Sequence, residues 1–182
     1  MAENAGKGRE IPVEIERKYL ARMPHVPALA CMEGYTVSDM EQAYLAAAPG
    51  TTHRVRARTS DGKTRFYETK KRRIDGMSAE EDEREITVEE YTALFAARDP
   101  ARRVIYKKRY TFIYKNQLFE VDIYPFWTKQ CVVETELPRR DMRAAFPSVL
   151  TVIREVTGDS RYSNAALSKE IPPEDETEET HI

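Results

Sequence analysis

Charged residues recur in pairs two positions apart along this sequence, and several pairs carry a single sign. The pairs are Glu14 and Glu16 (followed by Lys18), Arg54 and Arg56, Glu68 and Lys70, Glu83 and Glu85, Lys107 and Arg109, Glu120 and Asp122, and Glu134 and Glu136. Residues two apart on a β-strand point to the same face of the sheet. One such pair is typical of a solvated face, but like charges repeated on strand after strand require counter-charges.

The two signs suit the two parts of one ligand. Arg and Lys bind phosphate oxygens, whereas carboxylates bind hard cations such as Mg²⁺ or Mn²⁺. Unpaired charges are costly to bury, so an interior that carries both signs must stay wet or hold ions. The pattern therefore indicates a site for a metal–phosphate complex.

Short strands must position these charges, because the hydrophobic pattern has a period of two. Strands are expected at residues 13–20, 41–46, 52–59, 65–71, 83–87, 103–114, 117–124 and 130–137. Asp61-Gly62 and Lys115-Asn116 supply turns that accept positive φ, which predicts an antiparallel hairpin around each.

Few helices are expected. Thr87 and Glu90 form a capping-box pattern at the start of residues 88–98, whose apolar residues have helical spacing. A second helix is expected over residues 147–157, ended by Gly158, and a short third one over residues 163–169. Residues 74–82 are expected to form an exposed loop.

Closing these strands on themselves would bring the charged faces together. The predicted fold class is α+β, a closed eight-stranded antiparallel β-barrel whose interior is charged and whose apolar exterior is partly covered by a few helices. This inverts the usual small barrel, which fills its interior with apolar side chains.

The composition predicts one domain with flexible ends. The chain has 182 residues, of which 41% are hydrophobic, enough for one core. We expect a flexible N-terminus (1–10), a tunnel domain (11–169) and an acidic, disordered tail (170–182). The tail holds six acidic residues and no Lys or Arg, which leaves the rest of the chain with 29 basic and 25 acidic residues. A mildly basic body suits an anionic ligand.

The same sequence argues against several partners and compartments. No stretch approaches the roughly 18 apolar residues of a membrane span, and residues 1–10 lack the apolar core of a signal peptide. Cys31 and Cys131 fit no disulfide framework and no metal spacing. The basic run at residues 70–73 lacks interleaved aromatics. We therefore expect a cytoplasmic protein without membrane or nucleic-acid partners.

The run Glu14-Ile15-Glu16-Arg17-Lys18 has the E-x-E-x-K form that marks the CYTH superfamily, the triphosphate tunnel metalloenzymes, which this chain resembles over residues 12–169. The order of the later motifs is similar as well: Gln42-Ala43-Tyr44-Leu45, Arg54-Val55-Arg56, Glu68-Thr69-Lys70, Glu83-Arg84-Glu85, Lys107-Lys108-Arg109-Tyr110, Glu120-Val121-Asp122 and Glu134-Thr135-Glu136. Arg161-Tyr162-Ser163-Asn164 with Leu167 resembles the C-terminal segment of short bacterial members.

The resemblance implies an eight-stranded antiparallel tunnel that acts on a triphosphate with Mg²⁺ or Mn²⁺, and it leaves room for a homodimer. By position it implies Glu16, Glu134 and Glu136 as metal ligands and Lys18, Arg54, Arg56, Lys70, Lys107 and Arg109 as phosphate contacts. Glu14, Glu85 and Asp122 are candidates for catalysis. Glu83, Glu85, Glu120 and Asp122 are also open to holding a second metal, orienting water or pairing with basic side chains.

The expected reaction is hydrolysis of inorganic tripolyphosphate, or less efficiently of a nucleoside triphosphate, by in-line attack of water. The histidines are scattered, and no Ser-His-Asp or Cys-His pattern suggests a covalent intermediate. One alternative is another reaction in the same tunnel, adenylate cyclisation or thiamine triphosphate hydrolysis, with Tyr124, Phe126 or Trp127 stacking on a ring. A second alternative is a non-catalytic module that binds polyphosphate or nucleotide.

Overall fold

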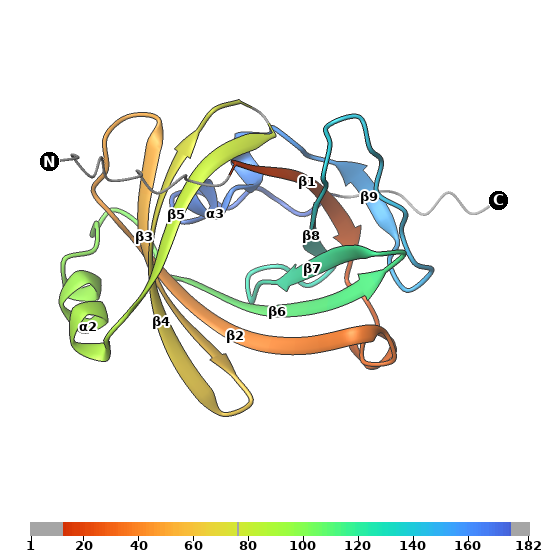
Figure 1. Ribbon diagram of the computed structural model, residues 1–182, viewed down its shortest axis with the longest axis horizontal. Helices are drawn as coiled ribbons and strands as arrows, with labels where there is room; N and C mark the ends of the chain where they lie inside the picture. The colour runs from red at the N-terminus through yellow and green to blue at the C-terminus, as the bar shows by residue number, and fades with distance from the viewer. Residues whose placement is uncertain (1–12, 76, 176–182) are drawn as a thin grey trace, which may run out of the picture.

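Antiparallel strands dominate the computed structural model, which describes residues 13–75 and 77–175 and side chains from residue 15 onward. The strands are β1 (Val13–Arg22), β2 (Glu33–Leu45), β3 (Thr51–Ser60), β4 (Lys63–Arg73), β5 (Ser78–Ile86), β6 (Ile105–Tyr114), β7 (Gln117–Ile123), β8 (Gln130–Glu136) and β9 (Val152–Glu155). Around the barrel the order is β1, β8, β7, β6, β2, β3, β4 and β5, and β5 pairs again with β1 (Figure 1). The prediction of a closed eight-stranded antiparallel barrel is confirmed.

Strand β1 has one edge that is shared by two partners. Its first residues, 13–15, pair with β5, and Tyr19 to Ala21 pair with β9. The prediction of a helix over residues 147–157 is therefore wrong. An unpaired strand edge exposes backbone donors and acceptors, and the β-branched pair Val152 and Ile153 favours an extended strand that satisfies them.

Two other predicted boundaries also differ from the structure. The expected loop at residues 74–82 contains the start of β5, which pairs with β4 from Ala79 onward. Strand β2 begins at Glu33, eight residues before the expected start at residue 41, and its first part pairs with β6. In both segments pairing with a distant part of the chain, β1 for the start of β5 and β6 for β2, helps to fix the strand, and the local residue pattern does not contain that information.

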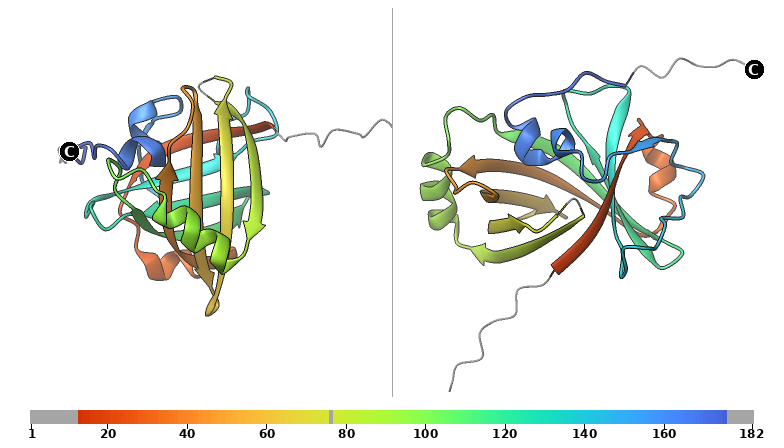
Figure 2. Two further views of the ribbon diagram at one scale, coloured as in Figure 1. Left: turned by 90° about the vertical axis from the view of Figure 1, so that its left-hand side faces the viewer. Right: turned by 90° about the horizontal axis from the view of Figure 1, so that it is seen from above.

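Short helices cover parts of the barrel. Helix α2 (Val88–Ala96) begins with the expected capping box of Thr87 and Glu90 and packs on the outer face of β2, β3 and β4 (Figure 2). Helix α1 (Val26–Leu29) follows β1, and the 3₁₀ turn η1 (Ser160–Tyr162) leads into α3 (Asn164–Leu167). Among the described residues, no helix is long and apolar enough to span a membrane.

One apolar cluster lies inside the barrel and closes one of its ends. It is formed by Leu20, Tyr44, Ile105, Tyr124, Trp127, Val132, Val156, Tyr162 and Leu167. Along β1 the inward face changes from Lys18 to Leu20, and along β8 it changes from Glu134 to Val132. We call this cluster the plug, and the charged part of the interior lies on one side of it.

The predicted tail begins at Glu170, but the structure holds residues 170–175 against the barrel. The Glu174 carboxylate accepts hydrogen bonds from the backbone N–H groups of Thr128 and Lys129 at 2.5 and 2.6 Å. Asp175 pairs with Arg154 at 2.5 Å. Residues 176–182 and the predicted flexible N-terminus 1–10 lie outside the described residues.

Candidate functional site: a charged cavity inside the barrel

The barrel encloses a cavity of about 500 Å³ whose lining is mostly charged. Its charged lining residues are Glu16, Lys18, Arg54, Arg56, Arg58, Lys71, Arg73, Glu81, Glu83, Arg109, Glu120, Glu134 and Glu136. The inward faces of seven barrel strands supply them, so many of the charges predicted from the sequence do converge. The segment of η1 and α3 adds Ser160, Ser163 and Asn164 to the lining.

Strand β3 provides a row of arginines on one side of the cavity. Arg54 donates to Glu81 at 2.9 Å, whereas the carboxylate that pairs with Arg56 is that of Glu83, at 3.8 Å. The Nε atoms of both arginines are buried and have no hydrogen-bond acceptor among the described residues. Buried donors without acceptors are costly, so this row is prepared to receive an anion.

The charge of Arg56 is only partly balanced. Burial, followed by the positive charges of Arg54 and Arg109, lowers the pKa of Arg56 to about 10, and Glu83 and Glu81 offset this only in part. An anion bound beside Arg56 would relieve both its burial penalty and the repulsion between the arginines.

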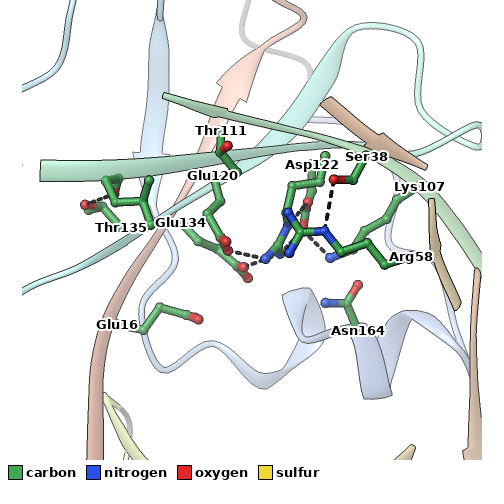
Figure 3. A network of polar contacts seen from close by, with 12 residues as sticks. Glu16, Ser38, Arg58, Lys107, Thr111, Glu120, Asp122, Glu134, Thr135 and Asn164 are labelled. Carbon is green, nitrogen blue, oxygen red and sulfur yellow. Dashed lines mark hydrogen bonds and ion pairs between the residues drawn. The ribbon is translucent and has the colours of Figure 1, made fainter. Parts of the chain in front are cut away.

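Arg109 lies at the centre of a second network, whose members Lys107, Glu120, Asp122 and Glu134 are labelled in Figure 3. It contacts both oxygens of Asp122 at 2.7 Å, donates to Glu134 at 2.9 Å and also pairs with Glu120. Lys107 donates to the same Asp122 carboxylate, and the side chains of Lys107 and Asp122 are both 0% exposed. These two side chains therefore lie beneath the cavity surface.

Asp122 serves two cations, which leaves Lys107 incompletely neutralised. Burial and the neighbouring charge of Arg109 lower the pKa of Lys107 to about 8, although Asp122 and Glu134 act in the opposite direction. Burial alone would raise the pKa of Asp122, but Arg109 and Lys107 outweigh it and hold that pKa below its ordinary value.

Carboxylates gather where β1, β8 and β7 lie side by side. The strand register places Glu16 opposite Glu136, and Glu134 opposite both Lys18 and Glu120. Lys18 contacts Glu134 at 2.7 Å and Glu16 at 3.4 Å, and its pKa is raised because these carboxylates outweigh the effect of burial. Within the described part of the chain, Glu136 makes no ion pair.

This acidic patch, Glu16, Glu120, Glu134 and Glu136, fits a hard cation by its chemistry. Like charges directly opposite each other on neighbouring strands repel, and burial together with Glu134 and Asp122 raises the pKa of Glu120 even though Arg109 opposes this. Carboxylate oxygens are the ligands that Mg²⁺ and Mn²⁺ prefer. Among the described residues, no three potential ligands are already gathered in a metal-binding arrangement.

Besides Lys107 and Asp122, which lie beneath the cavity surface, three other predicted site residues are not found in its described lining. Lys70, with 64% of its side chain exposed, lies on the outer face of β4 near Glu68. Glu85 lies near the end of β5, mostly exposed and 4.0 Å from Arg65. Glu14 belongs to β1, but its side chain lies outside the described residues.

The inward residues of β4 and β5 that sequence reasoning missed are Lys71, Arg73 and Glu81. The hairpin register explains the error, since outward-facing Val55 lies opposite Glu68, so Glu68 and Lys70 share its face. The run of four basic residues at 70–73 places charge on both faces of the strand, and period-two reasoning cannot choose between them. Pairing residues outward from the Asp61-Gly62 turn places Glu68 opposite Val55, and this would have identified the outward face of β4.

The aromatic residues that were candidates for stacking on a ligand ring pack in or against the apolar plug and do not line the cavity. Tyr124 and Trp127 are almost fully buried in the plug, and Phe126 packs against them. Within the described cavity lining, Tyr44 is the sole aromatic residue. The cavity wall is therefore built for charge and offers little aromatic surface.

Comparison with known proteins identifies relatives of this chain. No family model matches the chain. An inorganic triphosphatase from Nitrosomonas europaea (strain ATCC 19718) is 32% identical over 164 residues, which cover 87% of this chain and 99% of that protein.

Solved structures show the same fold. The crystal structure of the inorganic triphosphatase NE1496 is 27% identical, with a TM-score of 0.55 over 91% of this chain and 100% of that one. The PH1819 protein from Pyrococcus horikoshii OT3, at 20% identity, shares the fold with a TM-score of 0.55 over 70% of this chain and 80% of that one. Given the identity to the Nitrosomonas enzyme over nearly its whole length, this chain belongs to the same family, the CYTH or triphosphate tunnel family.

Proposed function

We propose that this protein is a metal-dependent triphosphatase that hydrolyses inorganic tripolyphosphate inside the barrel, with nucleoside triphosphates as poorer substrates. The observation that carries the proposal is the row of enclosed arginines on β3, in which Arg54 and Arg56 have buried donors without acceptors. The identity to an inorganic triphosphatase over most of the chain supports it.

Substrate binding would begin at this row. Phosphate oxygens would accept from the free Nε–H groups of Arg54 and Arg56, and their negative charge would balance the partly neutralised Arg56. Lys71 and Arg73 extend the same basic wall along β4. Because Lys107 lies beneath the surface, its role is to support Arg109 and Asp122 rather than to contact phosphate.

The acidic patch on β1, β7 and β8 lies across the cavity from the arginine row of β3, and it would hold the metal. Glu16, Glu134 and Glu136 are the ligands we assign, with Glu120 beside them. A divalent cation bound there would supply charge stabilisation for the phosphoryl oxygens as the bond to the leaving phosphate breaks. Lys18, which contacts Glu16 and Glu134, would then be released to a phosphate oxygen.

The attacking water needs a carboxylate that is exposed to the cavity. Asp122 is sealed below Arg109, and Glu85 lies outside the lining, so neither is suited to this role. Glu120 lines the cavity, and we assign it the orientation of water. Asp122 acts instead by holding the guanidinium of Arg109 through two hydrogen bonds of 2.7 Å.

An all-phosphate substrate agrees with the lining better than a substrate with a ring. Adenylate cyclisation and thiamine triphosphate hydrolysis both require a pocket for a ring, and the aromatic residues suggested for that purpose are packed into the plug. A non-catalytic module would bind the same substrates without releasing phosphate.

A phosphate-release screen tests the proposal. Tripolyphosphate, pyrophosphate, ATP, GTP and thiamine triphosphate are each incubated with Mg²⁺, Mn²⁺ or a chelator, and cyclic AMP is assayed in parallel. We expect tripolyphosphate to give the highest kcat/KM and the chelator to abolish release. Arg56→Gln should lose most of this activity, whereas Lys70→Gln on the outer face of β4 should retain it. Binding without release would support the non-catalytic module, and cyclic AMP formation would support the cyclase.

A further inference from the structure

The first residue of α3, Asn164, lines the cavity beside the plug. It belongs to the Arg161-Tyr162-Ser163-Asn164 motif, which the proposed mechanism does not use. Its amide oxygen Oδ1 accepts a hydrogen bond of 2.7 Å from the hydroxyl of Tyr124. A cavity residue is thus tied to a residue of the apolar plug.

This hydrogen bond fixes the orientation of the amide. The side chain of Tyr124 is buried in the plug, and a buried tyrosine hydroxyl needs an acceptor for its proton. Among the described residues, Oδ1 of Asn164 is that acceptor. A carboxamide has its acceptor and its two donors on separate atoms, so Nδ2 must point to the other side.

The Nδ2 donor is directed into the charged cavity. Figure 3 shows the Asn164 side chain extending from its helix below the network, with the amide nitrogen on the side of Glu16 and Glu134. Among the described residues, the hydrogen bond of the Asn164 side chain is the one that Oδ1 accepts from Tyr124, and Nδ2 has no acceptor. A neutral donor held in one direction at the closed end of a cavity is suited to an incoming anion.

We propose that Nδ2 of Asn164 donates a hydrogen bond to a phosphate oxygen of the bound triphosphate, and that Tyr124 is a positioning residue that keeps this donor facing the cavity. This inference rests on the proposed function, since it assigns a further contact to the same substrate. It places one end of the phosphate chain next to the plug.

Two substitutions at Asn164 separate phosphate binding from a purely structural role. Asn164→Asp keeps the acceptor for Tyr124 but replaces the donor with a second oxygen, which would repel phosphate. Asn164→Ala removes both. A hydrogen bond to a charged acceptor corresponds to about tenfold or more in affinity. We therefore expect the dissociation constant for tripolyphosphate to rise about tenfold in Asn164→Ala and further in Asn164→Asp. If the residue is only structural, Asn164→Asp will behave like the wild type and Asn164→Ala will melt at a lower temperature.

Tyrosine variants test the positioning role with a matched control. Tyr124→Phe frees the amide to rotate and should raise KM several-fold with a smaller change in kcat. Tyr162→Phe removes another plug hydroxyl, one that accepts from Arg154 at 2.8 Å and does not contact Asn164, so its KM should stay unchanged. An equal rise in KM for both variants would overturn the positioning role.

Calorimetric binding and phosphate release are measured on the same variants. Tripolyphosphate that binds with the expected order of affinities but is not hydrolysed would refute the proposed enzyme activity and retain the Asn164 contact. Normal hydrolysis with unchanged affinity in Asn164→Asp would refute the contact and retain the activity. If the wild type does not bind tripolyphosphate at all, both proposals are wrong.

Discussion

Replacing Arg56 by methionine should stabilise the empty protein while removing its ligand. Arg56 is nearly fully buried, its nearest carboxylate is 3.8 Å away, and two other arginines contribute to lowering its pKa to about 10. That pKa corresponds to about 3 kcal/mol of unfavourable free energy for the charged form, since each tenfold change in proton affinity is 1.36 kcal/mol. Because the cavity is wet and screens part of this repulsion, we expect about 1–2 kcal/mol in practice.

Methionine keeps much of the aliphatic length of arginine, so the packing of β3 should survive the change. One kcal/mol moves the melting temperature of a domain of this size by about 2–4 °C, so Arg56→Met should melt about 2–8 °C above the wild type without ligand. Tripolyphosphate with Mg²⁺ or Mn²⁺ should raise the melting temperature of the wild type, because a ligand that binds only the folded state stabilises it. This ligand-induced shift should be largely lost in Arg56→Met.

Differential scanning fluorimetry with and without tripolyphosphate measures both effects. Arg72→Met is the matched control, because Arg72 lies on the outer face of β4 and pairs with Glu80 at 2.6 Å. It should show neither the gain in stability nor the loss of the ligand-induced shift. A lower melting temperature for Arg56→Met, combined with a ligand-induced shift equal to that of the wild type, would refute the reasoning.

Three further predictions follow from other parts of the structure. Glu136→Ala should abolish metal-dependent phosphate release without lowering the melting temperature, and turnover like that of the wild type would exclude Glu136 as a ligand. Lys107 has a pKa of about 8 in the folded protein and 10.5 in the unfolded chain, so between these pH values the unfolded chain binds more protons. The free energy of unfolding should therefore rise with pH in this range, and it should rise less steeply in Lys107→Met. Denaturant titrations at about pH 7.5 to 10 measure both slopes. Deleting residues 170–182 removes the contacts of Glu174 and Asp175, whereas deleting residues 176–182 keeps them. The longer deletion should therefore melt about 2–4 °C below the shorter one. Equal melting temperatures would show that these contacts do not stabilise the fold.

The barrel was predictable because its signal is local and repeated. Alternating charge and apolar residues identify a strand and its two faces wherever the alternation is clean, as at Lys107 and Arg109 or at Glu134 and Glu136. Asp61 and Gly62 do adopt positive φ at 49° and 72°, as the hairpin prediction requires. Like charges on many such faces then imply a shared interior, because each face alone lacks its counter-charge.

The remaining errors arise where pairing across the barrel decides the outcome. Residues 152–155 become a strand because β1 has an open edge; the β-branched residues Val152 and Ile153 favour an extended chain, but the local sequence does not show that this edge is available. Lys70 and Lys71 are chemically equivalent, and the register with β3 alone sends Lys71 inward. The sealed position of Lys107 likewise depends on a carboxylate fifteen residues away, at Asp122. The sequence therefore predicts the chemical groups of such a site more readily than it predicts how deeply each side chain is buried.

The most direct test of the binding site is a crystal structure of the Glu136→Gln variant grown with tripolyphosphate and Mn²⁺. The proposed function predicts phosphate oxygens within hydrogen-bond distance of Arg54 Nε and Arg56 Nε, and anomalous density for manganese beside Glu16 and Glu134. Phosphate found on the outer face of β4 at Lys70, with the cavity holding only water, would contradict it.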